Sequence, residues 1–502
     1  MRRVFVLLID AASPDLIETW TDDGTLPNLK ALRGRGAYGR VGSVADWLAE
    51  ATSYALFSGR NPAATGLHCG SMWQKETMKA RTPGKDWLPF QPFWRTFDAG
   101  GPRAIVIDPP NVYPPEPFNG IEVIGWATHD TLAPFQTYPP ALAATIQSRF
   151  GSTLIGDEIY GLVSKRRFLD ERRCMLEINS KFRDLCMGLM DGQSWDLFFG
   201  GLFTAHQAGH RLWSAVNVKG KLSEAHRADL DDTIRQVYVS IDGVVGDLVK
   251  AAGEEAVVLV LSLHGMDVNH SRGWIFPEML RRVQGITPVS PSLLDRLRKL
   301  IPVEWRHAVK SLLPFESRRG LTRYWRMRAH TWETTRAFGL FSDTQGWVRL
   351  NVKGREALGI VQPGAEYDQL CQEIADGLKT FVDADTGEPI IKDIVRPHQM
   401  FEGEHLDDLP DMVVRWAETP ASRHRAVASP KFGVIPWPTP GRNPEGRSGN
   451  HRGQGMLIAA GPGIGPGTID AVDILDIAPT ILSLLGQPVP AAMEGRPLNL
   501  LR

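Results

Sequence analysis

The stretch WDLFFGGLFTAHQAGHRLW, residues 195–213, joins a strongly apolar run to a polar segment that carries two histidines. The run that ends at Phe203 is apolar on both faces, as in a strand that is covered from both sides of a sheet. His206 and His210 are four residues apart, and this spacing places both side chains on one face of a helix. The stretch therefore predicts a buried strand followed by a helix that presents two imidazoles together.

The same alternation of apolar runs and helical patterns extends along the chain. Helical patterns cover residues 165–192 and 225–252. Further short apolar runs lie at residues 4–9, 103–108, 256–262, 412–416 and 455–461. Runs that are apolar on both faces and separated by helices are typical of a mostly parallel sheet with helices on both sides. We therefore expect an α/β fold whose mostly parallel sheet is flanked by helices on both faces.

Length and composition are those of one large domain with insertions. The chain has 502 residues, of which 43% are hydrophobic and 23% charged, so it can bury a sizeable core. We expect a single domain over residues 1–502, with cap or lid insertions at about 68–102, 109–190 and 283–335. The last insertion is strongly basic. This composition can indicate either a solvated helical face or a docking surface for an anionic substrate or partner. Residues 418–454 are expected to form a long loop.

Charge and cysteine usage exclude several classes of function. The net charge of -1 gives no reason to expect binding to a nucleic acid polymer or to an anionic membrane. No run approaches the roughly 18 apolar residues that a transmembrane segment needs. The apolar run at 4–9 ends in Asp10 without a cleavage site, which indicates a strand rather than a signal peptide. Four scattered cysteines fit reduced thiols, and we expect a cytoplasmic protein.

Polar residues gather where the predicted strands end. Ligands of open α/β sheets bind at the carboxyl ends of the strands, so these positions are the candidates for chemistry. The five residues at this edge are Asp10, His206, His210, His264 and His451. A histidine pair at helical spacing is common by itself, but four imidazoles and a carboxylate at one edge indicate a metal site. This donor set suits zinc better than manganese or iron. His68 and His270, which fall near the same edge, are interpreted as loop histidines.

Several stretches resemble the type I phosphodiesterase/nucleotide pyrophosphatase branch of the alkaline phosphatase superfamily. They occur in the order of that family and lie at residues 6–41, 57–66, 195–213, 260–266, 449–464 and 472–498. The resemblance implies an alkaline-phosphatase-like fold and hydrolysis of phosphoric esters. It also implies two divalent ions about 4 Å apart, as in other two-metal sites. A threonine, serine or modified cysteine acts as nucleophile in that family.

The resemblance carries over to individual positions of this chain. Asp10 matches the first aspartate of the family. His210 and His451 match two histidine ligands of one ion, and His264 matches a histidine ligand of the other.

Three positions depart from the pattern of the family, and they change the expected metal content. His206 stands in place of an aspartate ligand, Leu263 replaces a second aspartate, and Ala49 stands where the nucleophile is expected. Neutral imidazoles do not compensate positive charge, so two adjacent dications would repel strongly at this site. We therefore expect one zinc ion held by three histidines with an open fourth position. The second pocket, around Asp10 and His264, is expected to be empty, weakly occupied or used by substrate.

The missing hydroxyl at Ala49 closes the covalent route through that position. Direct attack by a water activated at the metal is one possibility, with Glu50 or His264 as the base. Attack by Thr52 from a shifted turn and binding without turnover are the other two. Arg452 is expected to contact a phosphate oxygen of the substrate.

The sequence thus predicts a metal-dependent hydrolase of phosphoric esters that acts on a small-molecule or glycan phosphoester through one histidine-rich site. A catalytically inactive member of the superfamily that serves as a binding or regulatory module is the first alternative. A sulfate ester hydrolase or a phosphotransferase on the same scaffold is the second, although Ala49 counts against the usual sulfatase nucleophile. The oligomeric state is left open.

Overall fold

The structure is a computed structural model of the chain. It describes residues 2–84, 91–128, 131–151, 161–286, 301, 312–313, 317, 320 and 330–501. Its centre is a large sheet that contains ten strands within these residues. In spatial order the strands are β20 (Gly467–Thr468), β2 (Ala37–Gly42), β19 (Gly455–Ala460), β9 (Ala256–Ser262), β1 (Arg3–Ile9), β8 (Leu197–Leu202), β5 (Ala104–Ile107), β6 (Gly120–Ile124) and β7 (Gln136–Tyr138), with β21 (Val472–Asp473) beside β2.

The middle of this sheet is parallel. β1 pairs in parallel with β8 and β9, and β5 continues the parallel order from β8 to β6. β19 runs antiparallel between β9 and β2, and β7 is antiparallel to β6. The predicted α/β class with a mostly parallel sheet is confirmed. The five parallel strands therefore end at one edge, where β19 also begins.

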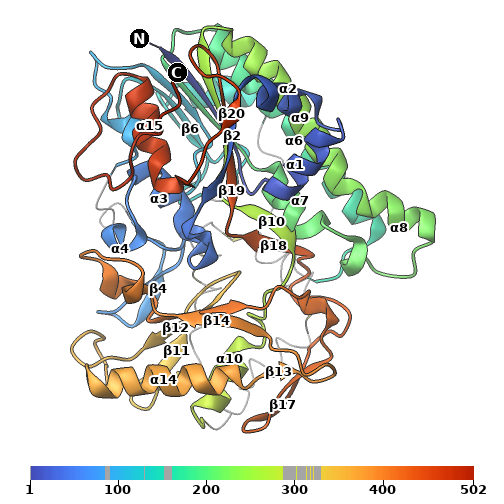
Figure 1. The fold of residues 1–502 in the computed structure, drawn as a ribbon, viewed down its shortest axis with the longest axis vertical. Helices are drawn as coiled ribbons and strands as arrows, with labels where there is room; N and C mark the ends of the chain where they lie inside the picture. The colour runs from blue at the N-terminus through green and yellow to red at the C-terminus, as the bar shows by residue number, and fades with distance from the viewer. Residues whose placement is uncertain are drawn as a thin grey trace.

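Side chains alternate between two apolar layers along the central strand. Phe5 and Leu7 of β1 pack into one layer, and Val4 and Val6 pack into the other. The first layer is covered by α1 (Pro14–Asp22), α2 (Pro27–Arg35), α6 (Lys165–Asp191), α7 (Thr204–Leu212) and α9 (Thr233–Ala252). The second is covered by α3 (Thr52–Ser58) and α15 (Ile477–Leu484), on the opposite side of the sheet in Figure 1.

The predicted helical patterns correspond closely to helices of the structure. The pattern at 165–192 corresponds to α6, whose first turn is capped by the Ser164 side chain through the amide of Arg167. The pattern at 225–252 is divided at Asp232 into α8 (Glu224–Asp231) and α9. Both long helices pack on the same face of the sheet and on each other.

A second body of antiparallel sheets lies beyond one edge of the large sheet (Figure 1). Two helices, α10 (Phe276–Val283) and α14 (Ala365–Lys379), pack on it. Its strands are β11 (Ala337–Gly339), β12 (Gly346–Leu350), β15 (Met412–Trp416) and β14 (Ile391–Val395) in one sheet, and β13 (Val382–Asp383), β16 (Ala426–Ser429) and β17 (Gly433–Pro436) in another.

Two expectations for this region were wrong. The apolar run at 412–416 is not a strand of the parallel sheet but β15, in the middle of an antiparallel one. It resembles a central parallel strand because both of its faces are buried: Met412 and Val414 pack in the core of the second body, whereas Val413 packs against the main core. Residues 418–454 are not one long loop, since they contain β16, β17 and the site strand β18 (Gly449–Arg452).

The three segments that were expected to form a cap have different places in the structure. Residues 68–102 contain the hairpin of β3 (Met72–Gln74) and β4 (Lys79–Arg81). Residues 109–190 contain β6, β7, α5 (Leu142–Phe150) and most of α6, so they contribute strands to the large sheet. Most of 283–335 lies outside the described residues. The cap role of these segments and the single-domain division stay predictions.

Membrane-spanning helices were sought separately. Among the residues described, no helix has both the length and the hydropathy that crossing a bilayer would require.

Candidate metal centre

The candidate site lies at the edge where the parallel strands end. α7 begins directly after β8 and carries His206 and His210 on its first two turns. β18 carries His451 and pairs antiparallel with β10 (Gly265–Val268), so that His451 lies opposite Met266. Figure 1 shows β10 and β18 between the large sheet and the antiparallel body. The site is therefore built by two segments that are far apart in the sequence.

The three imidazoles meet through their Nε2 atoms. The Nε2 atom of His206 lies 3.0 Å from that of His210 and 3.0 Å from that of His451, and the last two are 2.9 Å apart. All three side chains are buried, and within the described residues they are the one cluster that could hold a metal ion. Zinc–nitrogen bonds of about 2.0–2.1 Å allow one ion to contact all three atoms. The donor set thus fits a nitrogen-preferring divalent ion.

Two glycines allow α7 and β18 to approach closely enough for this convergence. A Cβ atom on Gly449 would lie 2.3 Å from the backbone oxygen of Gly209. The amide of Ser448 donates to the carbonyl oxygen of His210 at 2.7 Å, which fixes the contact. Backbone packs against backbone here, because a side chain at Gly449 would meet the backbone of α7 and separate the two elements.

The outer ring nitrogens of the two helical histidines have acceptors of different kinds. His206 Nδ1 lies 2.6 Å from Asp10 Oδ2, and both side chains are buried. His210 Nδ1 lies 3.2 Å from the carbonyl oxygen of Gly449. These acceptors assign the proton to Nδ1 in both rings, so that each Nε2 lone pair faces the shared centre. Ligand histidines of metal sites are held in this way by carboxylates and backbone carbonyls.

His451 completes the set with a neutral ring. Burial, followed by the repulsion of protonated neighbours at His264, His206 and His210, lowers the pKa of His451 well below its usual range. The ring is therefore unprotonated near neutral pH, as metal binding requires. Its Nδ1 atom is buried and makes no hydrogen bond to the described residues.

Asp10 and His264, the other two predicted ligands, lie against the cluster rather than within it. Asp10 Oδ2 accepts a hydrogen bond from His206, and Asp10 Oδ1 is 3.9 Å from His264 Nε2. The His264 ring stacks on His451, with 4.4 Å between ring centroids and 16° between ring planes. The structure thus brings all five predicted residues together, with three donor atoms at the centre.

Two of the positions that depart from the pattern of the family carry apolar side chains, and the polar side chains next to Ala49 are hydrogen-bonded to backbone groups. Ala49 and Leu263 are both buried, and Leu263 packs in the main core. The hydroxyl of Thr52 donates to the carbonyl oxygen of Ala49 at 3.0 Å, so it is used within its own helical turn. Glu50, the other candidate base, accepts a hydrogen bond of 2.9 Å from the amide of Gly70.

Arg452, the predicted phosphate contact, is paired with two carboxylates. Its Nη2 atom lies 2.6 Å from Asp267 Oδ2, and its Nη1 atom lies 2.8 Å from Glu418 Oε2. The side chain is partly exposed in a cleft that His451 also lines. It is therefore next to the centre, but it reaches a substrate oxygen only by exchanging one of these carboxylates.

His68 and His270 are buried side chains whose pKa values are lowered to about 4. Burial is the main cause in both cases, and the charges of Arg452 and Arg272 add to it for His270. His68 contacts the Trp347 ring edge to face, whereas His270 lines the cleft beside His451. His68 thus belongs to the core and His270 to the wall of the site.

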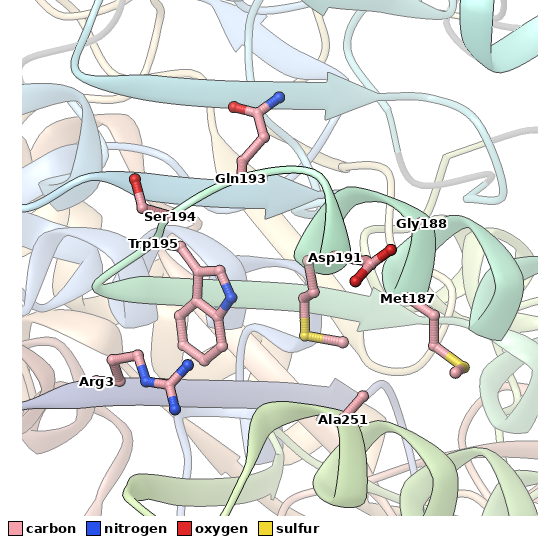
Figure 2. A pocket seen from close by; sticks show the side chains of 9 residues that line it. Arg3, Met187, Gly188, Asp191, Gln193, Ser194, Trp195 and Ala251 are labelled. Atoms are coloured by element: carbon pink, nitrogen blue, oxygen red, sulfur yellow. The ribbon is translucent and has the colours of Figure 1, made fainter.

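A second hollow lies at the opposite, amino-terminal edge of the sheet (Figure 2). Arg3, at the start of β1, lies over the Trp195 ring there, with its guanidinium carbon 5.1 Å from the ring centroid. Asp191 is the one carboxylate among the described residues that line it, and none of them is a histidine or a cysteine. This hollow offers no metal-ligand set, so the chemistry belongs at the histidine edge.

Sequence reasoning missed the glycines and the contribution of the antiparallel body. Gly209 stands one residue before His210 and Gly449 two residues before His451, and a glycine this close to a candidate histidine is the signal that could have revealed them. Lys392, Arg415 and Trp416 come from the antiparallel body and line the cleft beside His451. No pattern in the sequence places those three residues at this edge.

Comparisons with known proteins agree with this architecture. The family model described as type I phosphodiesterase / nucleotide pyrophosphatase matches residues 4–419. No curated protein matches the chain. Phosphonoacetate hydrolase from Sinorhizobium meliloti, solved in complex with phosphonoformate, is 12% identical with a TM-score of 0.50, over 97% of this chain and 95% of its own.

Two ectonucleotide pyrophosphatase/phosphodiesterase 5 structures are also similar. The human protein is 11% identical with a TM-score of 0.48, and the match covers 100% of both chains. An inactive variant of the murine protein, solved with AMP, is 13% identical with a TM-score of 0.47, over 98% of this chain and 96% of its own. At such identities the likeness concerns the fold alone.

Proposed function

The chain belongs to the type I phosphodiesterase/nucleotide pyrophosphatase family of the alkaline phosphatase superfamily, and from this we propose that it is a metal-dependent hydrolase of phosphoric esters. The observation that carries the proposal is the convergence of three buried Nε2 atoms, on His206, His210 and His451, within 3.0 Å of one another. Phosphodiesters of small molecules or glycans are the proposed substrates, and the scattered cysteines favour the cytoplasm as the compartment.

We propose a single zinc ion because the site has little negative charge. Among the residues that the structure describes, Asp10 is the carboxylate hydrogen-bonded to the cluster, and its Oδ2 atom accepts from His206. Leu263 and the imidazole of His206 supply none of the charge that a second dication would need nearby. Three neutral nitrogens favour zinc over magnesium or manganese, which prefer oxygen ligands.

When bound, the ion supplies Lewis acidity that lowers the pKa of a coordinated water and stabilises charge on phosphoryl oxygens. Asp10 holds His206 in the tautomer that presents Nε2. Of the two predicted bases, we favour His264, because its ring stacks on His451 and its Nε2 atom faces Asp10 at 3.9 Å. It is thus placed to accept a proton from an attacking water. Glu50 is tied to the amide of Gly70 and is the second candidate.

The proposal is tested by measuring metal content and turnover on the same preparation. Elemental analysis of the purified protein is expected to give one zinc per chain. A panel of phosphomonoesters, phosphodiesters and sulfate esters is expected to show turnover of phosphodiesters. H210A should lose both the ion and the activity, whereas H226A, at a histidine on α8 outside the cluster, should lose neither. Two tightly bound ions per chain would contradict the single-ion site.

A second candidate function is a binding module that does not turn over its ligand. Ala49 is the observation that favours it, because the family's nucleophile position carries no hydroxyl and the Thr52 hydroxyl is engaged by the Ala49 carbonyl oxygen. This function predicts that a phosphonate analogue of a phosphodiester binds to the zinc-loaded protein while the whole ester panel stays intact. Turnover that is abolished by H210A would exclude it.

A further inference from the structure

A cleft opens beside His451, between β18 and the antiparallel body. Three cations line it, Lys392 from β14, Arg415 from β15 and Arg452 from β18, together with two carboxylates. The indole of Trp416 forms part of its wall. Anything that occupies the cleft lies next to one of the three proposed metal ligands, so the lining can recognise the part of a substrate that does not react.

All three cations are paired with carboxylates. Arg452 contacts Asp267 at 2.6 Å and Glu418 at 2.8 Å. Lys392 contacts the other oxygen of Glu418 at 2.8 Å. These contacts form a chain of alternating charges along one wall of the cleft, and Glu418 is shared by both cations.

Arg415 is paired with Asp393, but only one edge of its guanidinium group is used. Its Nε and Nη2 atoms donate to the two oxygens of Asp393, with 2.7 Å for the Nε bond. Its Nη1 atom is 3.8 Å from Asp46 Oδ2, too far for a hydrogen bond, and it makes none among the described residues. The guanidinium carbon lies 5.6 Å from the Trp47 ring centroid, which orients the plane of the group. A rigid cation with an unused pair of N–H donors thus lines the cleft.

Two further polar groups of the lining lack partners in the described part of the chain. The Oε1 atom of Gln345 is buried without a hydrogen bond, although its Nε2 atom is anchored to the carbonyl oxygen of Ala45 at 2.8 Å. The Nε1 atom of Trp416 is likewise buried without an acceptor. Buried polar groups are normally hydrogen-bonded, so an acceptor and a donor without partners in one lining indicate a ligand with complementary groups.

We propose that this cleft is a specificity subsite. It would bind an oxyanion in a part of the substrate remote from the reacting phosphorus, and Arg415 would be the residue that recognises this oxyanion. The proposal rests on the proposed hydrolase function. A guanidinium group with a free edge matches the paired oxygens of a carboxylate or of a second phosphate. Asp46 is half exposed and only loosely paired, so it can move aside.

The experiment compares three p-nitrophenyl phosphodiesters that share the reacting group. Their second alcohols are n-propyl, 2-carboxyethyl and 2-phosphonooxyethyl, so the first is neutral beyond the ester and the other two distinguish the sources of the oxyanion. We expect kcat/KM of the protein for at least one anionic ester to exceed that for the propyl ester about tenfold or more. R415Q is expected to bring this ratio close to one, mainly through KM, and R415K to retain part of it.

Arg396 supplies a matched control in the same body. It also pairs with an aspartate, Asp368, at 2.7 Å, and lies 5.1 Å from the ring centroid of Tyr367, but it is not part of the cleft. R396Q should therefore leave the ratio of the wild type unchanged. A ratio near one in the wild type, or equal losses for all three esters in R415Q, would overturn the subsite and leave Arg415 as a structural link between β15 and β14.

Failure of the hydrolase function gives a different result. None of the three esters would then be cleaved, and the subsite is tested by calorimetric binding of the matching methylenephosphonate analogues. Tighter binding of an anionic analogue that is lost in R415Q supports the subsite in a protein that does not catalyse. Equal binding of the neutral and anionic analogues, or no binding of either, overturns it.

Discussion

At the scale of single residues, the hydrogen bond between Asp10 and His206 determines how the His206 ring is oriented in the candidate metal site. A buried carboxylate that accepts from Nδ1 fixes the ring and makes Nε2 a better donor to a metal. In the proposed site Asp10 would act on the ion through His206, as a positioning residue, and would add one negative charge beside the three imidazoles.

Asp10→Asn provides the direct test of this role. The asparagine oxygen can still accept from His206 but carries no charge, so zinc should bind about tenfold more weakly at an unchanged one ion per chain. Competition with a chromogenic chelator measures the affinity, and elemental analysis the ratio. D15N, at an exposed aspartate on α1, is the control. Complete loss of the ion in D10N, equal to that in H206A, would make Asp10 a direct ligand.

Much of this residue set was predictable from the sequence. Asp10, His264 and the three histidines of the cluster each stand at the end of a strand or beside one, and the carboxyl ends of parallel strands meet at one edge. The sequence could not show whether Asp10 binds the metal directly or accepts a hydrogen bond from a histidine of the cluster. It depends on a distance of 2.6 Å across the core, between segments that are 196 residues apart.

At the scale of elements, the contact between α7 and β18 determines whether the three nitrogens meet. Gly209 and Gly449 oppose each other across it. A Cβ atom on Gly209 would meet the Met266 side chain at 2.4 Å, and this flexible side chain can move. A Cβ atom on Gly449 would instead meet backbone, which cannot.

Alanine substitutions at the two glycines should therefore differ in severity. G449A should weaken zinc binding strongly and destabilise the protein by about 1–3 kcal/mol, because α7 and β18 must separate. G209A should have a smaller effect on both. Zinc titration and urea denaturation measure the two quantities. Gly243, exposed on α9 with no neighbouring atom within 4 Å, is the control, and G243A should leave zinc binding unchanged. Equal metal affinity in all three variants would refute this account.

Elements were predictable where local pattern and burial agree. Within the predicted helical patterns at 165–192 and 225–252, α6 and α9 pack on the large sheet, and their apolar faces have the helical period. β15 was assigned to the wrong sheet because burial on both faces is a property of layers, whichever way the neighbouring strands run. The hydrophobic pattern of a strand shows whether one or both of its faces are buried, but it does not show which elements cover those faces.

At the scale of the whole molecule, buried charges join the β3–β4 hairpin to the antiparallel body. Glu356, which is 3% exposed, accepts from the Arg349 guanidinium at 2.7 Å and from Arg355 at 3.1 Å. Its other oxygen accepts from the indole of Trp73, on the β3–β4 hairpin, at 2.8 Å. Arg349 lies on β12 of the antiparallel body, so this carboxylate ties the hairpin to that body.

Removal of this carboxylate should cost more than removal of a surface charge. E356A leaves the buried Arg349 guanidinium without its anion, and we expect a loss of about 3–5 kcal/mol in unfolding free energy. E373A, at a half-exposed glutamate 4.0 Å from Arg336, should change it by less than about 1 kcal/mol. Guanidinium chloride denaturation compares the variants. Similar midpoints for E356A and E373A would show that the network contributes little.

The arrangement of the whole molecule was the least predictable level. The parallel sheet follows from short-range alternation of strands and helices, and it is confirmed. The packing of the β3–β4 hairpin against the antiparallel body depends on contacts such as the one between Trp73 and Glu356, which are 283 residues apart. Charged residues in a sequence normally indicate exposure to solvent, and the partners of the few that are buried can be identified only in the folded structure.

The long separation of His451 from the other two imidazoles also has a consequence for biosynthesis. His206 and His210 share one helix, but the third donor follows 241 residues after His210. At translation rates of about 5–20 residues per second, a nascent chain carries an unfinished donor pair for roughly 10–50 s before the third emerges. An ion that needs all three donors is therefore expected to bind only after β18 has been synthesised and has docked against α7.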